Sequence, residues 1–485
     1  MVYCIMVDDD VLMSFIRSQQ FEIRYLANET KKDMIKPRFK YFEIIKHIDN
    51  FISRDKNYYN RLLMIPGLRG VGKSTLLYQV YSYLNTERGI DEDNIFYVNV
   101  DDLKSSVDSD IKTLFELFIE NVHDTIPLTL NKKIFLLVDE AQFDEKWANY
   151  AKLLFDKNSR IFMIFTGSSA LNLNLNTDAT RRITTLRLYP CNFREYLYLK
   201  YDIDIKSYDL RELILNTNSS IVEKAEKYEK YLYKQLYNLP NDSNIELKKY
   251  LHTQSFPFAL DNEDIEVHKL TYEVIKRIIK DDLLEFKSYN KLDDKIISRI
   301  ITYIATKKAG KTSNNNIAQY VGISANTVDN LLDILEKTEL LFEVSAYRGA
   351  GTITKKPKEH FFITPSIKST LNYRIGRYHL NNRKCYSLLV ENMVASTLNI
   401  LVNEASISMG LFYDSKKKGV DFLLKCVDDV IPIEVGIGKK TKSQLTMAIN
   451  RYNAKYGILI SNRNDRITFE NNILHIPLLT FTLMF

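Results

Sequence analysis

The chain has 485 residues, of which 45% are apolar and 26% charged, values typical of a globular protein with roughly two to four domains. Its net charge of +6 is small for this length and does not by itself indicate a nucleic-acid partner, and its scattered cysteines (Cys4, Cys191, Cys385 and Cys426) show no zinc-site spacing. Acidic residues 8–10 stand where a signal peptide would be basic, and no apolar run approaches the roughly 18 residues of a membrane span, so we expect a cytoplasmic protein with no membrane partner.

The first residues are less informative than those that follow. Residues 1–36 are polar and mixed, and we expect a short N-terminal lead-in there. A helix with one apolar face is predicted next; it opens at Pro37-Arg38-Phe39, and its apolar residues are Phe42, Ile44, Ile45 and Ile48.

A phosphate-binding loop follows the apolar run 62–65. The pattern G-x-x-x-x-G-K-S/T is matched at every fixed position by Gly67, Leu68, Arg69, Gly70, Val71, Gly72, Lys73 and Ser74. Glycines let the backbone curl with its N–H groups inward, the lysine reaches the β- and γ-phosphates, and the serine hydroxyl ligates magnesium. A helix over 75–85, which begins at Thr75, would direct its N-terminus at the phosphates. A chance glycine-rich turn does not explain the flanking strand and helix, so ATP and magnesium are the predicted cofactors.

A second nucleotide motif lies downstream, after a strand predicted over 94–100 and a helix over 111–122. Five apolar residues, 134–138, run directly into Asp139 and Glu140, which is the Walker B pattern. Asp139 at the end of a buried strand would hold magnesium, and Glu140 would act as general base on the attacking water. The alternative is a plain strand that ends in an acidic loop.

Two further features follow along the chain. The apolar segment 160–165 ends in small polar residues, and Thr166, Ser168 or Ser169 would sense the γ-phosphate if this strand lies between the other two; a plain strand exit is the alternative. Arg181 and Arg182 stand in a polar loop before a strand predicted over 184–188. Either arginine would serve as a finger, in its own subunit or in a neighbour of a homo-oligomer, or both are solvated surface residues.

Several short segments then occur in a recognisable order. They are Ser168-Ser169-Ala170, Arg181-Arg182, residues 188–197, Ser255-Phe256-Pro257 and Glu391-Asn392-x-Val394. With the nucleotide motifs they resemble a large prokaryotic family of archaeal-type AAA ATPases related to the STAND NTPases. Its members join the ATPase domain to a winged-helix segment and to a domain that resembles PD-(D/E)XK nucleases. The resemblance implies an ATPase that acts on or near DNA, in defence or in the control of mobile elements.

Residues 317–328 predict a helix-turn-helix, with Gly322 in the turn and Ser324 as the cap of the second helix. Wing strands are expected over 341–347 and 360–363, and the loop between them carries Lys355, Lys356 and Lys358. The second helix offers Asn326, Thr327, Asn330 and Lys337 as contacts, but its acidic residues Asp329, Asp333 and Glu336 would repel phosphate. We favour a packing or protein-binding role for that helix and leave DNA backbone contact to the basic wing.

The last hundred or so residues contain the candidate nuclease site. Asp421 opens one predicted strand and Glu434 lies late in the next, beyond the turn at Asp428-Asp429; Glu391 suits the preceding helix. Such carboxylates would bind magnesium, and a lysine would steady the attacking water. The position expected for that lysine, however, is Gly436. The remaining candidates for the ammonium are Lys425, Lys439, Lys440 and Lys442, and a degenerate fold kept for binding is the alternative.

We therefore expect an α/β protein with a doubly wound parallel sheet, a helical and winged-helix middle and an α/β tail like a restriction endonuclease. The expected parts are the lead-in 1–36, the ATPase domain 37–200, a helical domain 201–290, the winged-helix domain 291–370 and the nuclease-like domain 371–485. In one hypothesis ATP hydrolysis controls the nuclease-like domain; in another the protein is a nucleotide-dependent switch or scaffold with an inert tail. A third, a module that binds ATP without hydrolysing it, is disfavoured by Glu140.

Overall fold

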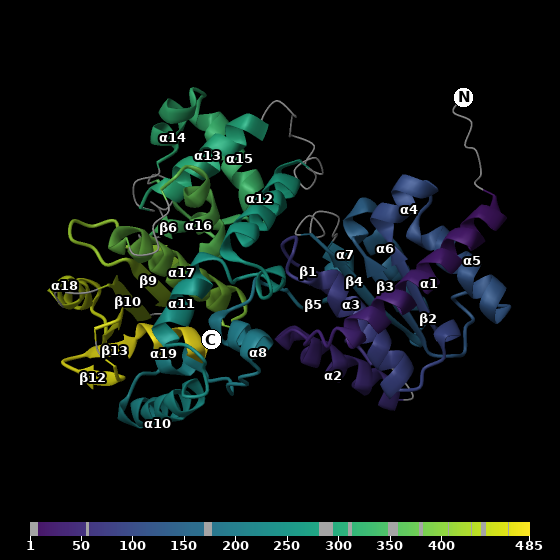
Figure 1. The fold of residues 1–485 in the computed structure, drawn as a ribbon, viewed down its shortest axis with the longest axis horizontal. Helices are drawn as coiled ribbons and strands as arrows, with labels where there is room; N and C mark the ends of the chain where they lie inside the picture. The colour runs from purple at the N-terminus through teal and green to yellow at the C-terminus, as the bar shows by residue number, and fades with distance from the viewer. Residues whose placement is uncertain are drawn as a thin grey trace. The chain divides into compact units, whose positions relative to one another are not determined.

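The computed structural model describes most of the chain, in several stretches. These are residues 8–54, 58–168, 177–280, 294–308, 313–347, 357–377, 382–405, 407–427, 429–437, 443–463 and 465–485. The chain divides into two compact units, Met1–Tyr189 (unit 1) and Pro190–Phe485 (unit 2), and Figure 1 labels most elements of each.

Unit 1 is built on a parallel sheet with the strand order β2-β3-β4-β1-β5. Its strands are β1 (Leu62–Pro66), β2 (Ile95–Asn99), β3 (Ile134–Asp139), β4 (Ile161–Gly167) and β5 (Thr184–Thr185). Strands β1, β3 and β4 are buried along their whole length, because helices cover both faces of a doubly wound sheet. The predicted α/β class is confirmed, and β4 lies between β1 and β3 as expected.

The helices of unit 1 pack on the two faces of this sheet. They are α1 (Asp9–Lys32), α2 (Phe39–Ser53), α3 (Lys73–Ser82), α4 (Val100–Ser106), α5 (Ile111–His123), α6 (Trp147–Lys157) and α7 (Thr177–Thr180). On one face Phe51 of α2 contacts Phe135 and Phe162; on the other, Phe115 of α5 contacts Phe96. The apolar face predicted for α2 was wrong at Phe42, which is 53% exposed, because the helix turns Ile44, Ile48 and Phe51 inward instead.

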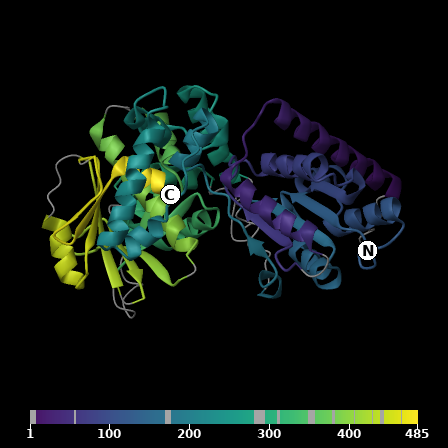
Figure 2. The ribbon, with the colours of Figure 1, turned by 90° about the horizontal axis from the view of Figure 1, so that it is seen from below.

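The polar lead-in expected over residues 1–36 is instead occupied by α1, a 24-residue helix. It is the long dark purple helix of Figure 2, and it packs against α3, α5 and β2. Since β2 is an edge strand, one side of its backbone lacks a strand partner. The Gln20 amide donates to the Tyr97 carbonyl at 3.0 Å, and the Asn99 N–H donates to the Gln19 side chain at 2.8 Å. Helix α1 thus covers a sheet edge that would otherwise be open to pairing with another chain.

Unit 2 contains a mixed sheet with the strand order β12-β13-β11-β10-β9-β8-β6-β7. The strands are β6 (Leu341–Ala346), β7 (Glu359–Phe362), β8 (Met409–Tyr413), β9 (Phe422–Cys426), β10 (Asp429–Gly436), β11 (Gly457–Ser461), β12 (Thr468–Glu470) and β13 (Ile473–Pro477). Strands β9 and β10 form an antiparallel pair, and so do the two expected wing strands β6 and β7. Strand β6 also pairs with β8 in parallel, so one sheet runs from the wing strands to the C-terminal strands.

Helices before, between and after these strands complete unit 2. They are α8 (Phe193–Tyr201), α9 (Leu210–Leu215), α10 (Ser219–Leu236), α11 (Ser243–His252), α12 (Asp264–Lys280), α13 (Asp294–Thr306), α14 (Asn314–Val321), α15 (Ala325–Lys337), α16 (Pro365–Arg374), α17 (Arg383–Asn403), α18 (Ser443–Tyr452) and α19 (Leu478–Met484). Within the described stretches one helix, α17, is long and apolar enough to cross a membrane, but 61% of its apolar window is buried. It is the core helix of this unit.

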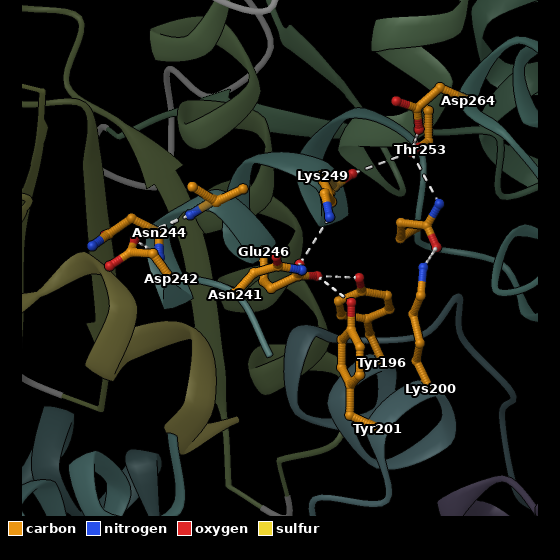
Figure 3. Close-up of polar contacts among 12 residues, drawn as sticks. Tyr196, Lys200, Tyr201, Asn241, Asp242, Asn244, Glu246, Lys249, Thr253 and Asp264 are labelled. Atoms are coloured by element: carbon orange, nitrogen blue, oxygen red, sulfur yellow. Dashed lines mark hydrogen bonds and ion pairs between the residues drawn. The ribbon is translucent and has the colours of Figure 1, made fainter. Parts of the chain in front are cut away.

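A buried carboxylate links α11 to α8 in unit 2. Glu246 of α11 is fully buried, and its two oxygens accept hydrogen bonds from Tyr196 (2.6 Å), Tyr201 (2.8 Å), Asn241 (2.7 Å) and Lys249 (2.9 Å) (Figure 3). Burial raises the pKa of Glu246, but these hydrogen bonds outweigh burial and leave it below its usual value. Every acceptor position is used, so the arrangement is structural rather than a ligand site.

Candidate functional site

The phosphate loop joins β1 to α3, and its three glycines are needed for two different reasons. Gly70 and Gly72 have φ of 82° and 96°, a left-handed conformation that strains other residues, and Gly72 is the N-cap of α3. At Gly67 the constraint is space, because a Cβ there would lie 2.4 Å from the carbonyl oxygen of Leu188. Leu68 and Val71 of the loop are buried, which anchors the loop in unit 1.

Lys73 lies inside the curve of this loop. Only 5% of the residue is exposed, and its ammonium donates to the carbonyls of Gly67 (2.9 Å) and Leu68 (3.2 Å). Buried Arg38, which the sequence suggested only as a helix start, donates to the carbonyls of Val71 and Tyr189. The loop is therefore held from both sides, by Arg38 outside and Lys73 inside.

Asp139, at the end of β3, is fully buried beside the loop. Its Oδ1 accepts hydrogen bonds from the Thr166 hydroxyl and from the Glu140 N–H, whereas its Oδ2 accepts none from the described residues. Burial and the Glu140 carboxylate raise the pKa of Asp139, while the Ser74 and Thr166 hydroxyls and the Lys73 charge partly offset the rise. A buried carboxylate beside a serine hydroxyl suits a hard divalent cation, so Asp139 and Ser74 fit the predicted magnesium ion.

Glu140 is held by a residue that sequence reasoning missed. The Gln142 amide donates to Oε2 of Glu140 at 2.5 Å, and its carbonyl oxygen accepts the Ser168 N–H at 3.2 Å. Gln142 is 2% exposed, so it links the predicted general base to the end of β4. Its position two residues after Glu140 was the available signal, but no motif marks it.

The structure distinguishes among the three sensor candidates. Thr166 already donates to Asp139, and Ser169 lies outside the described residues. The Ser168 hydroxyl is buried, with no hydrogen-bond partner in the part of the chain that is described. Its geometry therefore favours Ser168 as the group left for a ligand.

The two arginines of the following loop differ in their surroundings. Arg182 donates to the Asp156 carboxylate and to the Asp178 carbonyl, each at 2.5 Å. Arg181 is exposed, and the Tyr59 hydroxyl donates to its backbone carbonyl. Arg182 is thus hydrogen-bonded within unit 1, whereas the Arg181 side chain is exposed to solvent.

In unit 2 the structure brings the three predicted carboxylates together. The Asp421 N–H donates to the Glu434 carboxylate at 3.3 Å, and the Val435 N–H donates to the Asp421 carboxylate at 2.9 Å. Glu391 comes from α17, which its neighbour Asn392 fixes by exchanging hydrogen bonds of 3.1 and 2.8 Å with the backbone of Phe362. Asn392, which follows Glu391 in the segment Glu391-Asn392-x-Val394, thus joins α17 to β7.

Residue 436 is Gly, but an ammonium group lies near these carboxylates, that of Lys308 just after α13. Its Nζ lies 3.4 Å from Asp421 Oδ1 and 3.7 Å from Glu391 Oε1. Despite some burial, these carboxylates raise the pKa of Lys308, so it remains charged. Of the lysines suggested by sequence, Lys439, Lys440 and Lys442 lie outside the described residues, and Lys425 lies farther along β9, paired with Val430.

A fourth carboxyl group, Glu359 of β7, belongs to the same cluster. Burial and the charges of Glu391 and Asp421 raise its pKa to about 8, although Lys308 partly offsets them. Among the described residues, the buried Lys368 is a second ammonium group whose charge acts on Glu391.

Two helices joined by a short turn, α14 and α15, lie where the helix-turn-helix was predicted. Gly322 ends α14 with φ of 84°, and the Ser324 hydroxyl accepts the Thr327 N–H at 3.1 Å as the N-cap of α15. Lys358, expected in a basic wing, forms an ion pair with Glu343; Lys355 and Lys356 lie outside the described residues. DNA contact by this wing stays a prediction.

Comparisons with family profiles match three parts of the chain. Residues 59–197 match a profile described as an AAA domain. Residues 244–371 and 387–481 match two profiles described as domains of unknown function, DUF8612 and DUF4143. The nucleotide motifs thus lie in the AAA match, and the carboxylate cluster lies mainly in the DUF4143 match.

Whole-chain comparisons find both solved structures and curated sequences that resemble this chain. The chain is 11% identical to the Aeropyrum pernix ORC1 protein solved in complex with DNA, with a TM-score of 0.31, over 70% of this chain and 93% of that one; likeness at this level carries no functional information. An uncharacterized Haemophilus influenzae protein is 25% identical over 79% of this chain and 86% of its own. The uncharacterized protein MJ1637 of Methanocaldococcus jannaschii is 33% identical over 99% of this chain and 94% of its own. The chain belongs to the family of MJ1637, and its first unit carries the AAA-type P-loop ATPase domain.

Proposed function

We propose that unit 1 binds ATP with magnesium and hydrolyses it. The observation that carries this proposal is Asp139, a fully buried carboxylate beside Ser74 and Lys73, whose Oδ2 has no hydrogen-bond partner among the described residues. A carboxylate in this position is costly without a cation, and a nucleotide-bound magnesium ion would supply one.

Each residue then has a defined part in the reaction. The loop 67–75 binds the phosphates with its N–H groups, and Lys73 moves its ammonium from the loop carbonyls to the β- and γ-phosphates. Ser74 and Asp139 would hold the magnesium ion, which would neutralise charge on the phosphates. Glu140, oriented by Gln142, accepts the proton of the attacking water, and Ser168 donates to the γ-phosphate. Phosphate release from ATP by the purified chain, with magnesium or with excess chelator, tests the proposal.

Arg181, rather than Arg182, is the arginine we assign to the transition state. Because Arg182 is bound to Asp156 and Asp178, Arg181→Ala should lower turnover about a thousand-fold, whereas Arg182→Ala should change it only a few-fold. Phosphate release measured for each variant distinguishes the two. Normal hydrolysis by the double alanine variant would leave both as surface residues.

Subunit mixing determines where Arg181 acts. If one subunit provides Arg181 to the site of its neighbour in a homo-oligomer, mixing Arg181→Ala with Glu140→Gln should restore part of the activity that each variant lacks alone. The first variant would then keep its own base and receive an arginine from the second. If the mixture is no more active than the two variants measured separately, Arg181 acts in the site of its own subunit.

A second candidate function is supported by Lys308. With Asp421, Glu434 and Glu391 it supplies the carboxylates and the ammonium that metal-dependent phosphodiester hydrolysis requires. DNA is the substrate we propose, and the nucleotide state of unit 1 would control the reaction. The alternative is a switch or scaffold in which Lys308 merely neutralises an inert carboxylate cluster.

Cleavage assays distinguish a nuclease from a switch or scaffold in the C-terminal part of unit 2. With ATP and magnesium or manganese, labelled DNA should be cut by the parent chain and labelled RNA should not, and Asp421→Ala should remove the activity on DNA. Lys308→Ala should lower the rate roughly a hundred-fold, as loss of one electrostatic donor does, whereas Lys307→Ala serves as the adjacent control. No cleavage by the parent under any of these conditions would favour the scaffold.

A further inference from the structure

A cavity lies beside α13 in unit 2. Helix α13 packs there against α12, α14 and α16 (Figure 1), and the cavity that these helices line has a volume of about 280 Å³. Its buried lining is apolar and consists of Ile275, Ile279, Ile301 and Leu371. This volume is just below the range of roughly 300–1,000 Å³ that is usual for small-molecule sites, so the cavity suits one flat group rather than a large ligand.

The opening of the cavity combines aromatic and cationic side chains. Three helices contribute the residues there, which are Tyr272, Lys276, Arg299, Tyr320 and Arg374 with α14 as a fourth source. Lys276 forms an ion pair of 2.5 Å with Glu273, which does not itself line the cavity. Within the described part of the chain no acidic residue lines it, so its charges favour an anionic ligand.

Each of the two tyrosines has a cation over its ring. The Arg374 guanidinium carbon lies 3.4 Å from the ring centroid of Tyr272, and that of Arg299 lies 5.8 Å from the ring centroid of Tyr320. Arg299 also donates to the carbonyls of Tyr320 (3.0 Å) and Val321 (3.1 Å). Arg374, by contrast, makes no hydrogen bond with the described residues. A guanidinium held against an aromatic ring, with its N–H groups still available, is well suited to phosphate.

We propose that this cavity binds single-stranded DNA, with one unpaired base against Tyr320 and the apolar lining and a phosphate on Arg374. Aromatic side chains next to cations are the common means of holding unpaired nucleotides, because every base offers a flat face to stack on. An acidic protein segment would use the cations but not the aromatic surface.

This inference rests on the proposed action of unit 2 on DNA, and it specifies the form of that DNA. Helix α13 lines the cavity with Arg299 and Thr302 and ends at Thr306, two residues before Lys308. At 1.5 Å per residue, Thr302 and Lys308 are about 9 Å apart along the helix direction. An unpaired strand in the cavity would therefore pass close to the Asp421 carboxylate cluster.

Fluorescence anisotropy with a labelled thymidine oligonucleotide of about ten nucleotides, a usual site size, tests the cavity. Nucleotide-free full chain is used in excess chelator, so that no metal ion contributes and no strand is cut. Tyr320→Leu should weaken binding at least about five-fold, the lower end of what one stacked base contributes. Tyr237→Leu, at a 90% exposed tyrosine after α10, should leave binding unchanged. Binding of the same sequence as a duplex should not depend on Tyr320, because paired bases offer it no free face.

Arg374→Gln provides a change of a different kind. Loss of one phosphate contact should reduce the slope of log affinity against log salt concentration by about 0.7, whereas Tyr320→Leu should weaken binding without changing this slope. Arg277→Gln is the matched control, because Arg277 is an exposed arginine of α12 that does not line the cavity. Its slope should equal that of the parent.

Three results would overturn the proposal. They are parental affinity and slope in both Tyr320→Leu and Arg374→Gln, an equal dependence of duplex binding on Tyr320, and displacement of the oligonucleotide by polyglutamate at equal charge concentration. The last result would assign the cavity to an acidic protein segment. Binding with the expected dependences in a chain that cleaves no DNA would support the cavity and contradict the nuclease function alone.

Discussion

Lys73→Ala is expected to remove measurable ATP binding. The ammonium is buried inside the phosphate loop, where it donates to two loop carbonyls, and the phosphates of ATP would take over these hydrogen bonds. Hydrogen bonds to charged groups contribute about 1.5–3 kcal/mol each, so the loss of two should weaken binding at least about a hundred-fold. Calorimetry with a non-hydrolysable ATP analogue and magnesium measures the effect.

A matched control is available on the same unit. Lys112→Ala changes an exposed lysine of α5 and should leave the affinity unaltered. If Lys73→Ala bound the analogue as tightly as the parent while Lys112→Ala behaved normally, the loop would not be the nucleotide site.

Glu140→Gln should lower turnover by roughly two orders of magnitude or more, because an amide cannot accept the proton of water. The substitution preserves size, and its carbonyl oxygen can still accept the Gln142 hydrogen bond that positions residue 140. ATP affinity should therefore stay near that of the parent. Single-turnover phosphate release and analogue calorimetry, performed on the same preparation, separate the two quantities.

The control for this substitution lies in the same loop. Glu145→Gln removes an exposed carboxylate five residues further on and should hydrolyse ATP at the parental rate. Parental turnover in Glu140→Gln would show that another group is the base, and loss of binding in that variant would show that Glu140 holds the loop rather than the water.

The nucleotide site was largely predictable because its residues are close in sequence. Gly67 to Thr75 form one loop between a strand and a helix, and Asp139 ends an apolar strand, so local pattern and strand order place them together. Helix α1 shows the opposite case. Its buried positions Leu12, Ile16 and Ile23 are regularly spaced, but the polar glutamines that pair with the β2 edge made the segment look like a tail.

Lys308 could not be predicted in this way. It lies 113 residues before Asp421, and no sequence pattern around a single lysine after a helix identifies its partner. Asp421 and Glu434 were predictable as neighbours because adjacent antiparallel strands fix their register. What brings Lys308 to them is the packing of α13 in unit 2, which depends on long-range contacts that no local sequence pattern reports.

The continuous sheet of unit 2 has a consequence for how this protein can change in evolution. Ser345 and Ala346 of β6 pair with Phe412 and Tyr413 of β8, although the two strands belong to profiles with different names. Recombination at about residue 380 would replace one strand of the β6–β8 pair and could leave both strands with unpaired backbone groups at their edges. The two segments are therefore expected to be inherited as a pair, while unit 1 can be exchanged as a separate module.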